Sequence, residues 1–147
     1  MEKTIQEKYI DLINELYRSF DFFNQHFCEG VLRKPIITIQ GDKRAGSTYG
    51  WFGKNFWKET NDSKLDELNL TAESLHRTPE DVLETLIHEM AHLKNAQNDV
   101  FDCTSTQYHN GEFKKTAIFF GLEVTKMRGK GWAKTSLGQK AKDAIEL

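Results

Sequence analysis

Apolar residues recur every three or four positions in two long stretches of the chain, which is the spacing of amphipathic helices. The first stretch starts at Thr4, where a glutamate three positions later completes a capping box, and it ends near Glu29. The second starts at Thr78, with Pro79 at the first helical position, and runs to about Ala96. The pattern therefore predicts two long helices, one at the start and one in the middle of the chain.

Short β-rich segments lie between these helices, at residues 36–39, 47–52 and 67–71. They predict a small antiparallel or mixed sheet. Residues 112–120 predict a third helix that ends at Gly121, followed by a short strand or extended tail at 122–126. We therefore expect an α+β fold, with helices packed on a small sheet. A chain of 147 residues fits one such domain, spanning 1–147.

The composition is that of a globular protein, with 38% apolar residues and two prolines. The chain shows neither the apolar core of a signal peptide nor a stretch of about 18 apolar residues that would span a membrane. We expect a cytoplasmic protein with no membrane contact. Cys28 and Cys103 lack the C-x-x-C spacing of a zinc ribbon or redox pair, so we expect reduced thiols.

The last part of the chain, about 126–147, is predicted to be a basic tail. Residues 126–142 carry six positive charges and no acid, while the remainder holds 14 basic and 22 acidic residues. One interpretation is a solvated basic end. The other is a mobile segment that binds single-stranded or junction DNA, because basic side chains attract phosphates and an indole can stack on an unpaired base. The residues that would make this contact are Lys126, Arg128, Lys130, Trp132 and Lys134.

The second helix carries the pattern H-E-x-x-H at His88, Glu89 and His92. Histidines four apart stand one turn above each other, so their nitrogens can converge on one metal ion. Both lie opposite the apolar arc of the helix, and Glu89 beside them can reach a water on the metal without displacing a ligand. The alternative is that two histidines decorate a solvated helix face. The full pattern on an amphipathic helix favours binding of one zinc ion.

A catalytic zinc site needs a third protein ligand and leaves its fourth position for water. The downstream candidates are His109, Glu112 and Glu123. We favour His109, because imidazole suits zinc and this residue lies in a polar loop just before the third helix; the alternative is an ordinary exposed loop histidine. The H-x-x-G-x-x-H extension of one zincin branch is excluded, since Asn95 and Asn98 stand where its glycine and histidine would be.

Residues 84–92 together with 109–114 resemble the SprT-like, Spartan-type metallopeptidase domain. Residues 23–36 are similar to the opening helix and first strand of that family, so the resemblance covers about 9–125. Two features depart from it. Asn110 separates His109 from the following glycine, where the family usually has them adjacent, and the cysteine zinc ribbon that many relatives carry after this domain is missing from these residues.

The resemblance implies a zincin-like fold, with the active-site helix under a cleft edged by a strand. It also implies a zinc-dependent endopeptidase that cleaves protein substrates, including DNA-associated proteins, with Glu89 as general base. Tyr108 and Tyr49 are candidate helpers in stabilising the oxyanion. Two alternatives remain open: a non-catalytic zinc-binding protein with the same ligands, and a nucleic-acid-binding protein in which the zinc is structural.

Overall fold

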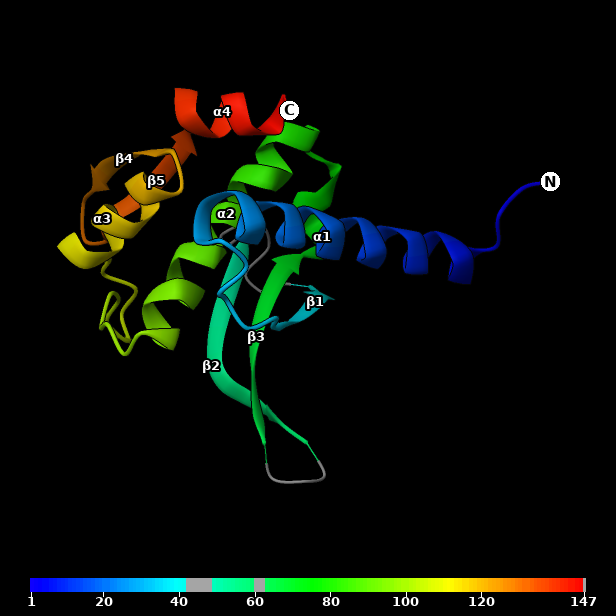
Figure 1. The fold of residues 1–147 in the computed structure, drawn as a ribbon, viewed down its shortest axis with the longest axis horizontal. Coiled ribbons are helices and arrows are strands. Elements are labelled where there is room, and N and C mark those ends of the chain that lie inside the picture. Colours follow the sequence, from blue (N-terminus) through cyan, green and yellow to red (C-terminus); the bar gives the residue numbers. More distant parts are fainter. Residues whose placement is uncertain (42–48, 60–62, 147) are drawn as a thin grey trace.

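Within residues 1–41, 49–59 and 63–146, which the computed structural model describes, four α-helices and two small sheets build an α+β fold (Figure 1). The larger sheet is mixed, with strand order β1-β3-β2. Strand β1 (Ile36–Gln40) lies parallel to β3 (Lys64–Thr71), and β2 (Gly50–Lys58) lies antiparallel to β3 on its other side. The expected α+β class is confirmed.

The two long helices begin where the capping residues predict. Helix α1 (Ile5–Cys28) follows Thr4, whose hydroxyl accepts the Glu7 N–H at 3.1 Å while the Glu7 carboxylate accepts the Thr4 N–H at 3.3 Å. Helix α2 (Pro79–Gln97) follows Thr78, whose hydroxyl accepts a backbone N–H of the first turn. Each cap satisfies donors that have no partner inside the helix, and so fixes the residue at which it starts.

Strand β2 begins later and runs further than the segment 47–52 suggested. It starts at Gly50 and continues to Lys58; Ser47 lies outside the described residues. The continuation was missed because its middle is polar and irregular: Asn55 has a φ of 57°, and the pairing with β3 shifts register between Gly53 and Trp57. With β3 it forms an arm that extends from the body (Figure 1).

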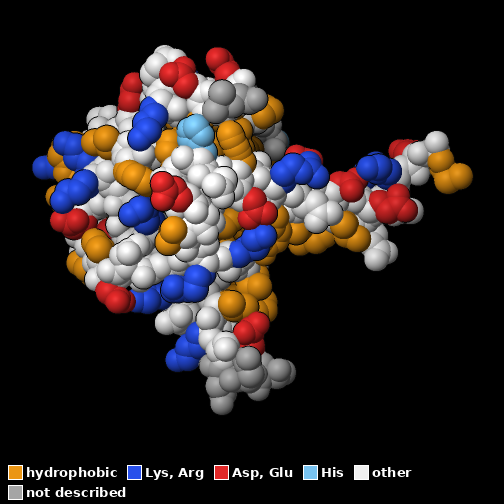
Figure 2. Space-filling model, in the orientation of Figure 1, with side chains coloured by type: hydrophobic (Ala, Val, Ile, Leu, Met, Phe, Trp, Pro, Cys, Tyr) orange, Lys and Arg blue, Asp and Glu red, His pale blue; other side chains and the backbone are white. Residues whose placement is uncertain are grey.

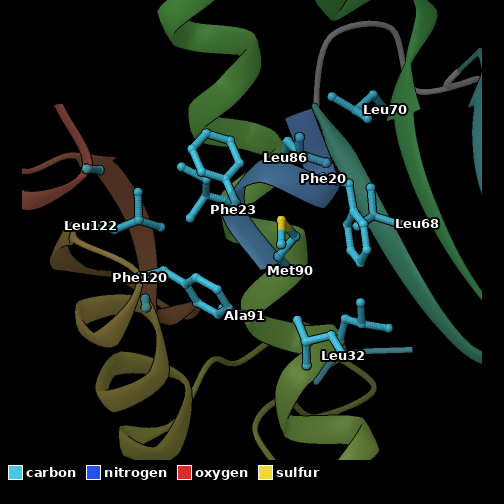
Figure 3. Packing of buried hydrophobic residues seen from close by; sticks show 14 of the residues in the cluster. Phe20, Phe23, Leu32, Leu68, Leu70, Leu86, Met90, Ala91, Phe120 and Leu122 are labelled. Carbon is cyan, nitrogen blue, oxygen red and sulfur yellow. The ribbon is translucent and has the colours of Figure 1, made fainter. Parts of the chain in front are cut away.

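Helix α2 lies at the centre of the molecule and is buried on several sides. Figure 3 shows Met90 in the middle of the main apolar cluster, with Leu68 of the sheet on one side and Phe120 and Leu122 on the other. Phe20 of α1 closes the cluster and is fully buried. Burial of each such side chain stabilises the fold by about 1.5–3 kcal/mol. This packing fixes the position of the helix that carries the H-E-x-x-H pattern.

The expectation of a mobile basic tail is wrong. Helix α3 (Gly111–Phe119) is followed by β4 (Leu122–Met127) and β5 (Gly131–Leu137), which pair as an antiparallel hairpin, and then by helix α4 (Gln139–Ile145). Gly121 ends α3 with a φ of +85°, as predicted, and approaches α4 so closely that a Cβ there would lie 2.6 Å from a backbone nitrogen. The C-terminal elements are therefore part of the packed fold.

The N-terminal half of α1 projects from the body (Figure 1). Apolar side chains lie along this projection in Figure 2, and they include the exposed residues Ile5, Tyr9, Ile10 and Leu12. They continue the apolar stripe that packs in the core further along the same helix. Neither α1 nor any other helix in the described part of the chain is long and apolar enough to cross a membrane.

Candidate metal centre

Three histidine side chains meet beside α2. His88 and His92 come from that helix, and His109 comes from the loop just before α3. One ligand nitrogen of each lies within 4.8 Å of those of the other two. His92 and His109 are buried and His88 is half-buried. Among the residues that the structure describes, these three form the group that is able to hold a metal ion.

Each histidine is held at its Nδ1 by a hydrogen-bond partner. His92 Nδ1 lies 2.8 Å from an Asp102 carboxylate oxygen, and His109 Nδ1 lies 3.0 Å from the Gln107 carbonyl. His88 Nδ1 lies 2.8 Å from the Thr135 hydroxyl, which donates its own proton to the Glu84 carboxylate. These partners act as acceptors, so each ring carries its proton on Nδ1 and leaves the Nε2 lone pair free. Outer partners of this kind orient the histidine ligands of metal sites.

The free Nε2 lone pairs make it favourable to place a positive charge between the histidines. His92 Nε2 and His109 Nε2 face each other at 3.2 Å, and two lone pairs at that distance repel unless a proton or metal cation lies between them. Burial acts to lower the pKa of His92, but the hydrogen bond to Asp102 and the nearby carboxylate charges outweigh it and raise that pKa. Burial and the charge of His92 lower the pKa of His109 to about 4. A cation is thus favoured in the centre of the group.

The histidine side of α2 is not a solvated face. The Phe113 ring lies under all three imidazoles, with centroid distances of 4.5 Å to His92, 4.6 Å to His109 and 4.8 Å to His88. Phe113 is fully buried, and Phe52 of β2 lies 6.5 Å from the His92 ring. The alternative of two histidines decorating an exposed helix surface is therefore contradicted.

Of the three candidates for a third ligand, the structure brings only His109 to the helix pair within the described residues. Glu112 and Glu123 are exposed. Asn110, which separates His109 from Gly111, is the N-cap of α3: its side-chain oxygen accepts the N–H groups of Glu112 and Phe113. Asn110 therefore caps the start of α3, and His109 directly before it lies with His88 and His92 in the candidate metal centre.

Glu89 lies in the same buried environment, on the β2 side of α2. It is 5% exposed, and a Cβ at Gly50 of β2 would lie 3.3 Å from its Cγ. Burial raises the pKa of its carboxyl from 4.5 to about 7, although the charge of His92 opposes this. No described residue makes a hydrogen bond to this carboxylate, which distinguishes it from the Asp102 carboxylate that holds His92.

The tyrosines proposed as helpers lie in different places. Tyr108 directly precedes His109 and is 39% exposed. Tyr49 precedes Gly50, and the Arg77 guanidinium lies 4.1 Å over its ring. Cys28 and Cys103 are both free thiols, as expected. The Cys103 sulfur lies 3.7 Å from His109 Nδ1, and burial raises the pKa of this thiol to about 11, so it stays protonated beside the centre.

The five residues suggested for nucleic-acid contact lie on the β4–β5 hairpin and its turn. The four basic side chains, Lys126, Arg128, Lys130 and Lys134, are exposed. Trp132 is half-buried and does not offer a free ring, because Lys114 Nζ lies 3.9 Å over its centroid and Lys126 Nζ lies 5.2 Å away. The stacking of a base on a mobile Trp132 is therefore not supported, while the exposed charges remain available to an anion.

Sequence reasoning missed the residues that hold the ligands in place. Asp102 binds His92 and also accepts the Asn95 amide at 2.9 Å, and Thr135 links His88 to Glu84. Asp102 could have been suspected from the sequence, because it is an acidic residue seven positions before His109 in the same loop. Thr135 gives no such signal, since it lies 47 residues from His88 on a different element.

Comparisons of the chain with family models, with curated proteins and with solved structures find no match.

Proposed function

We propose that this protein is a zinc-dependent endopeptidase of the SprT-like type, with a zincin-like arrangement of its active-site helix. The observation that carries the proposal is the convergence of three histidine nitrogens beside the buried Glu89, whose carboxylate has no hydrogen-bond partner among the described residues. Three neutral imidazoles with one position left for water are a common ligand set of catalytic zinc.

The geometry of the nitrogens suits zinc. Nitrogens bound at about 2.0–2.1 Å in a tetrahedral arrangement lie about 3.3 Å apart. The separation of 3.2 Å between His92 Nε2 and His109 Nε2 is close to this value. His88 needs only a small side-chain adjustment, since all the ligand atoms already lie within 4.8 Å of one another. The hydrogen bonds at Nδ1 fix the tautomer that binding requires.

Glu89 supplies the acid–base chemistry. When bound, zinc polarises the peptide carbonyl and lowers the pKa of a water in its open position to about 7. Glu89 takes the proton of the attacking water and passes it to the leaving amine. Burial raises the pKa of this carboxyl to about 7 in the metal-free chain, and a bound cation would favour the charged form that a general base needs. Since no described residue competes for a hydrogen bond with this carboxylate, Glu89 can hold that water.

The outer edge of β2 favours an extended peptide as the substrate. In the described strands, β2 pairs only with β3, so its other edge has unpaired backbone groups. Residues 50–53 of this edge pass Glu89 and the His92 ring. A peptide that adds to such an edge places its backbone in a defined register without requiring a particular sequence. This arrangement supports an endopeptidase of broad specificity acting on protein substrates.

Measurement of zinc content and casein degradation tests the proposal. Wild type should hold one zinc per chain and degrade casein. The Glu89→Gln variant should keep its zinc and lose activity about 10²–10⁴-fold, the usual contribution of a general base. Glu112→Gln is the matched control, because that glutamate is exposed and close in sequence to a ligand. Activity that is equal in wild type and Glu89→Gln contradicts the peptidase mechanism and leaves the non-catalytic zinc protein as the better explanation.

The exposed basic side chains of the hairpin support a second candidate function, the binding of DNA through its phosphates. Four such charges lie within nine residues and no acid interrupts them. Contacts of this kind bind phosphates without reading the base sequence. DNA bound at this hairpin would bring DNA-associated proteins close to the metal centre.

A further inference from the structure

The β4–β5 hairpin touches the metal centre at two points. The His109 N–H donates to the Lys130 carbonyl at 2.9 Å, and the Trp132 N–H donates to the His109 carbonyl at 2.9 Å. Further along β5, the Thr135 hydroxyl lies 2.8 Å from His88 Nδ1. The hairpin thus fixes the backbone of one candidate ligand and the side chain of another.

Thr135 connects His88 to a carboxylate. Its hydroxyl donates to Glu84, which lies one turn before His88 on the same helix. A hydroxyl has one proton to give, so Thr135 can receive the His88 Nδ1 proton only as an acceptor. The chain His88 Nδ1–H to Thr135 to Glu84 therefore runs in one direction. It leaves His88 Nε2 deprotonated, with its lone pair free to bind a metal ion together with the other two histidines.

We propose that Thr135 is a positioning residue of the metal centre, and that it sets the tautomer and ring orientation of His88. The other two histidines obtain the same support from residues of the loop before α3, Asp102 and the Gln107 carbonyl. His88 alone obtains it from the C-terminal hairpin. The inference rests on the metal-binding part of the proposed function and is independent of peptide hydrolysis.

Loss of the hydroxyl should weaken metal binding. Valine has nearly the same shape as threonine and the same preference for a strand, so Thr135→Val removes the hydrogen bonds and keeps the packing. The His88 ring can then turn, and its Nε2 competes with Nδ1 for the proton. Loss of an outer partner of a metal-bound histidine typically costs 10–100-fold in metal affinity.

The hairpin offers a matched control. Thr125 of β4 faces the opposite side of the hairpin from Thr135, is exposed and pairs with Lys134. Thr125→Val is therefore the same chemical change on the same hairpin, away from the centre. Thr135→Ser restores the hydroxyl without the methyl group, and Thr135→Ala removes both.

The experiment measures zinc affinity by competition with a chromophoric chelator, together with the absorption spectrum of the cobalt-substituted protein. We expect a 10–100-fold loss of affinity and an altered cobalt spectrum for Thr135→Val, and values near wild type for Thr135→Ser and Thr125→Val. If Thr135→Val does not fold, the comparison of Thr135→Ser with Thr135→Ala tests the same hydroxyl.

Two results are to be distinguished. A wild type that binds zinc, with Thr135→Val or Thr135→Ala binding as tightly as Thr135→Ser, overturns the role of Thr135 and leaves the proposed function intact. A wild type that binds neither zinc nor cobalt contradicts the proposed function itself, and the positioning role falls with it.

Discussion

Replacing Glu89 with glutamine in the metal-free protein should raise the free energy of unfolding, and the gain should grow with pH. Burial raises the pKa of this carboxyl from 4.5 to about 7. Between those values the folded chain keeps a proton that the unfolded chain releases, so the stability of wild type falls as pH rises through this window. Glutamine has nearly the same shape and no charge to bury, so the variant lacks this loss.

The size of the effect follows from the two pKa values. They differ by about 2.5, and a difference of 1 in pKa corresponds to about 1.4 kcal/mol, so the gain for Glu89→Gln approaches about 3 kcal/mol near pH 8. It should be small at about pH 4.5, where the unfolded carboxyl is half ionised, and should vanish at lower pH, where the carboxyl is protonated in both states. Zinc should shrink the gain, because a bound cation favours the charged carboxylate.

Urea unfolding in the presence of EDTA, at about pH 4.5, 6 and 8, measures this gain. Glu112→Gln, at an exposed position of α3, shows what the same substitution does without burial. A difference between wild type and Glu89→Gln that does not change with pH would refute the reasoning. So would a wild type that is the more stable of the two at pH 8.

Three further outcomes are expected. His109→Ala should lose stoichiometric zinc, measured by plasma emission on purified protein, while Glu112→Ala keeps it; the reverse would make Glu112 the third ligand. Asp102→Asn should weaken zinc binding about 10–100-fold in a chelator competition, because an amide holds the His92 tautomer less firmly; unchanged affinity would exclude that role. Single-stranded DNA binding, followed by fluorescence anisotropy, should weaken with salt and with Lys130→Glu and Lys134→Glu combined, and binding that ignores both would remove the hairpin from the DNA contact.

Much of the helical framework could be predicted because its signals are local. The caps at Thr4 and Thr78 lie within a few residues of the groups they satisfy. The pair His88 and His92 is set by the turn of a single helix, and His109, favoured because it lies in a polar loop just before the third helix, is found beside them. Such features depend on short stretches of sequence, which can be interpreted one stretch at a time.

The remaining features depend on contacts between distant segments. Strand β5 was taken for part of a basic tail because it is short, its sequence is mostly small and polar, and basic residues flank it on both sides, so its strand signal is weak. Its pairing with β4 and the bond from Thr135 to His88 appear only once the chain has folded. The same holds for the burial of Glu89, because Gly50 of β2, a distant part of the sequence, lies against its side chain.

The attachment of the hairpin to His109 and His88 also sets an order of assembly during synthesis. A ribosome delivers Glu89 and all three histidines well before it delivers Lys130, Trp132 and Thr135, the residues that hold two of those histidines in place. Until that later segment has emerged, the His109 backbone and the His88 Nδ1 lack these partners. The full hydrogen-bond support of the histidine group therefore forms only when the hairpin pairs, late in synthesis.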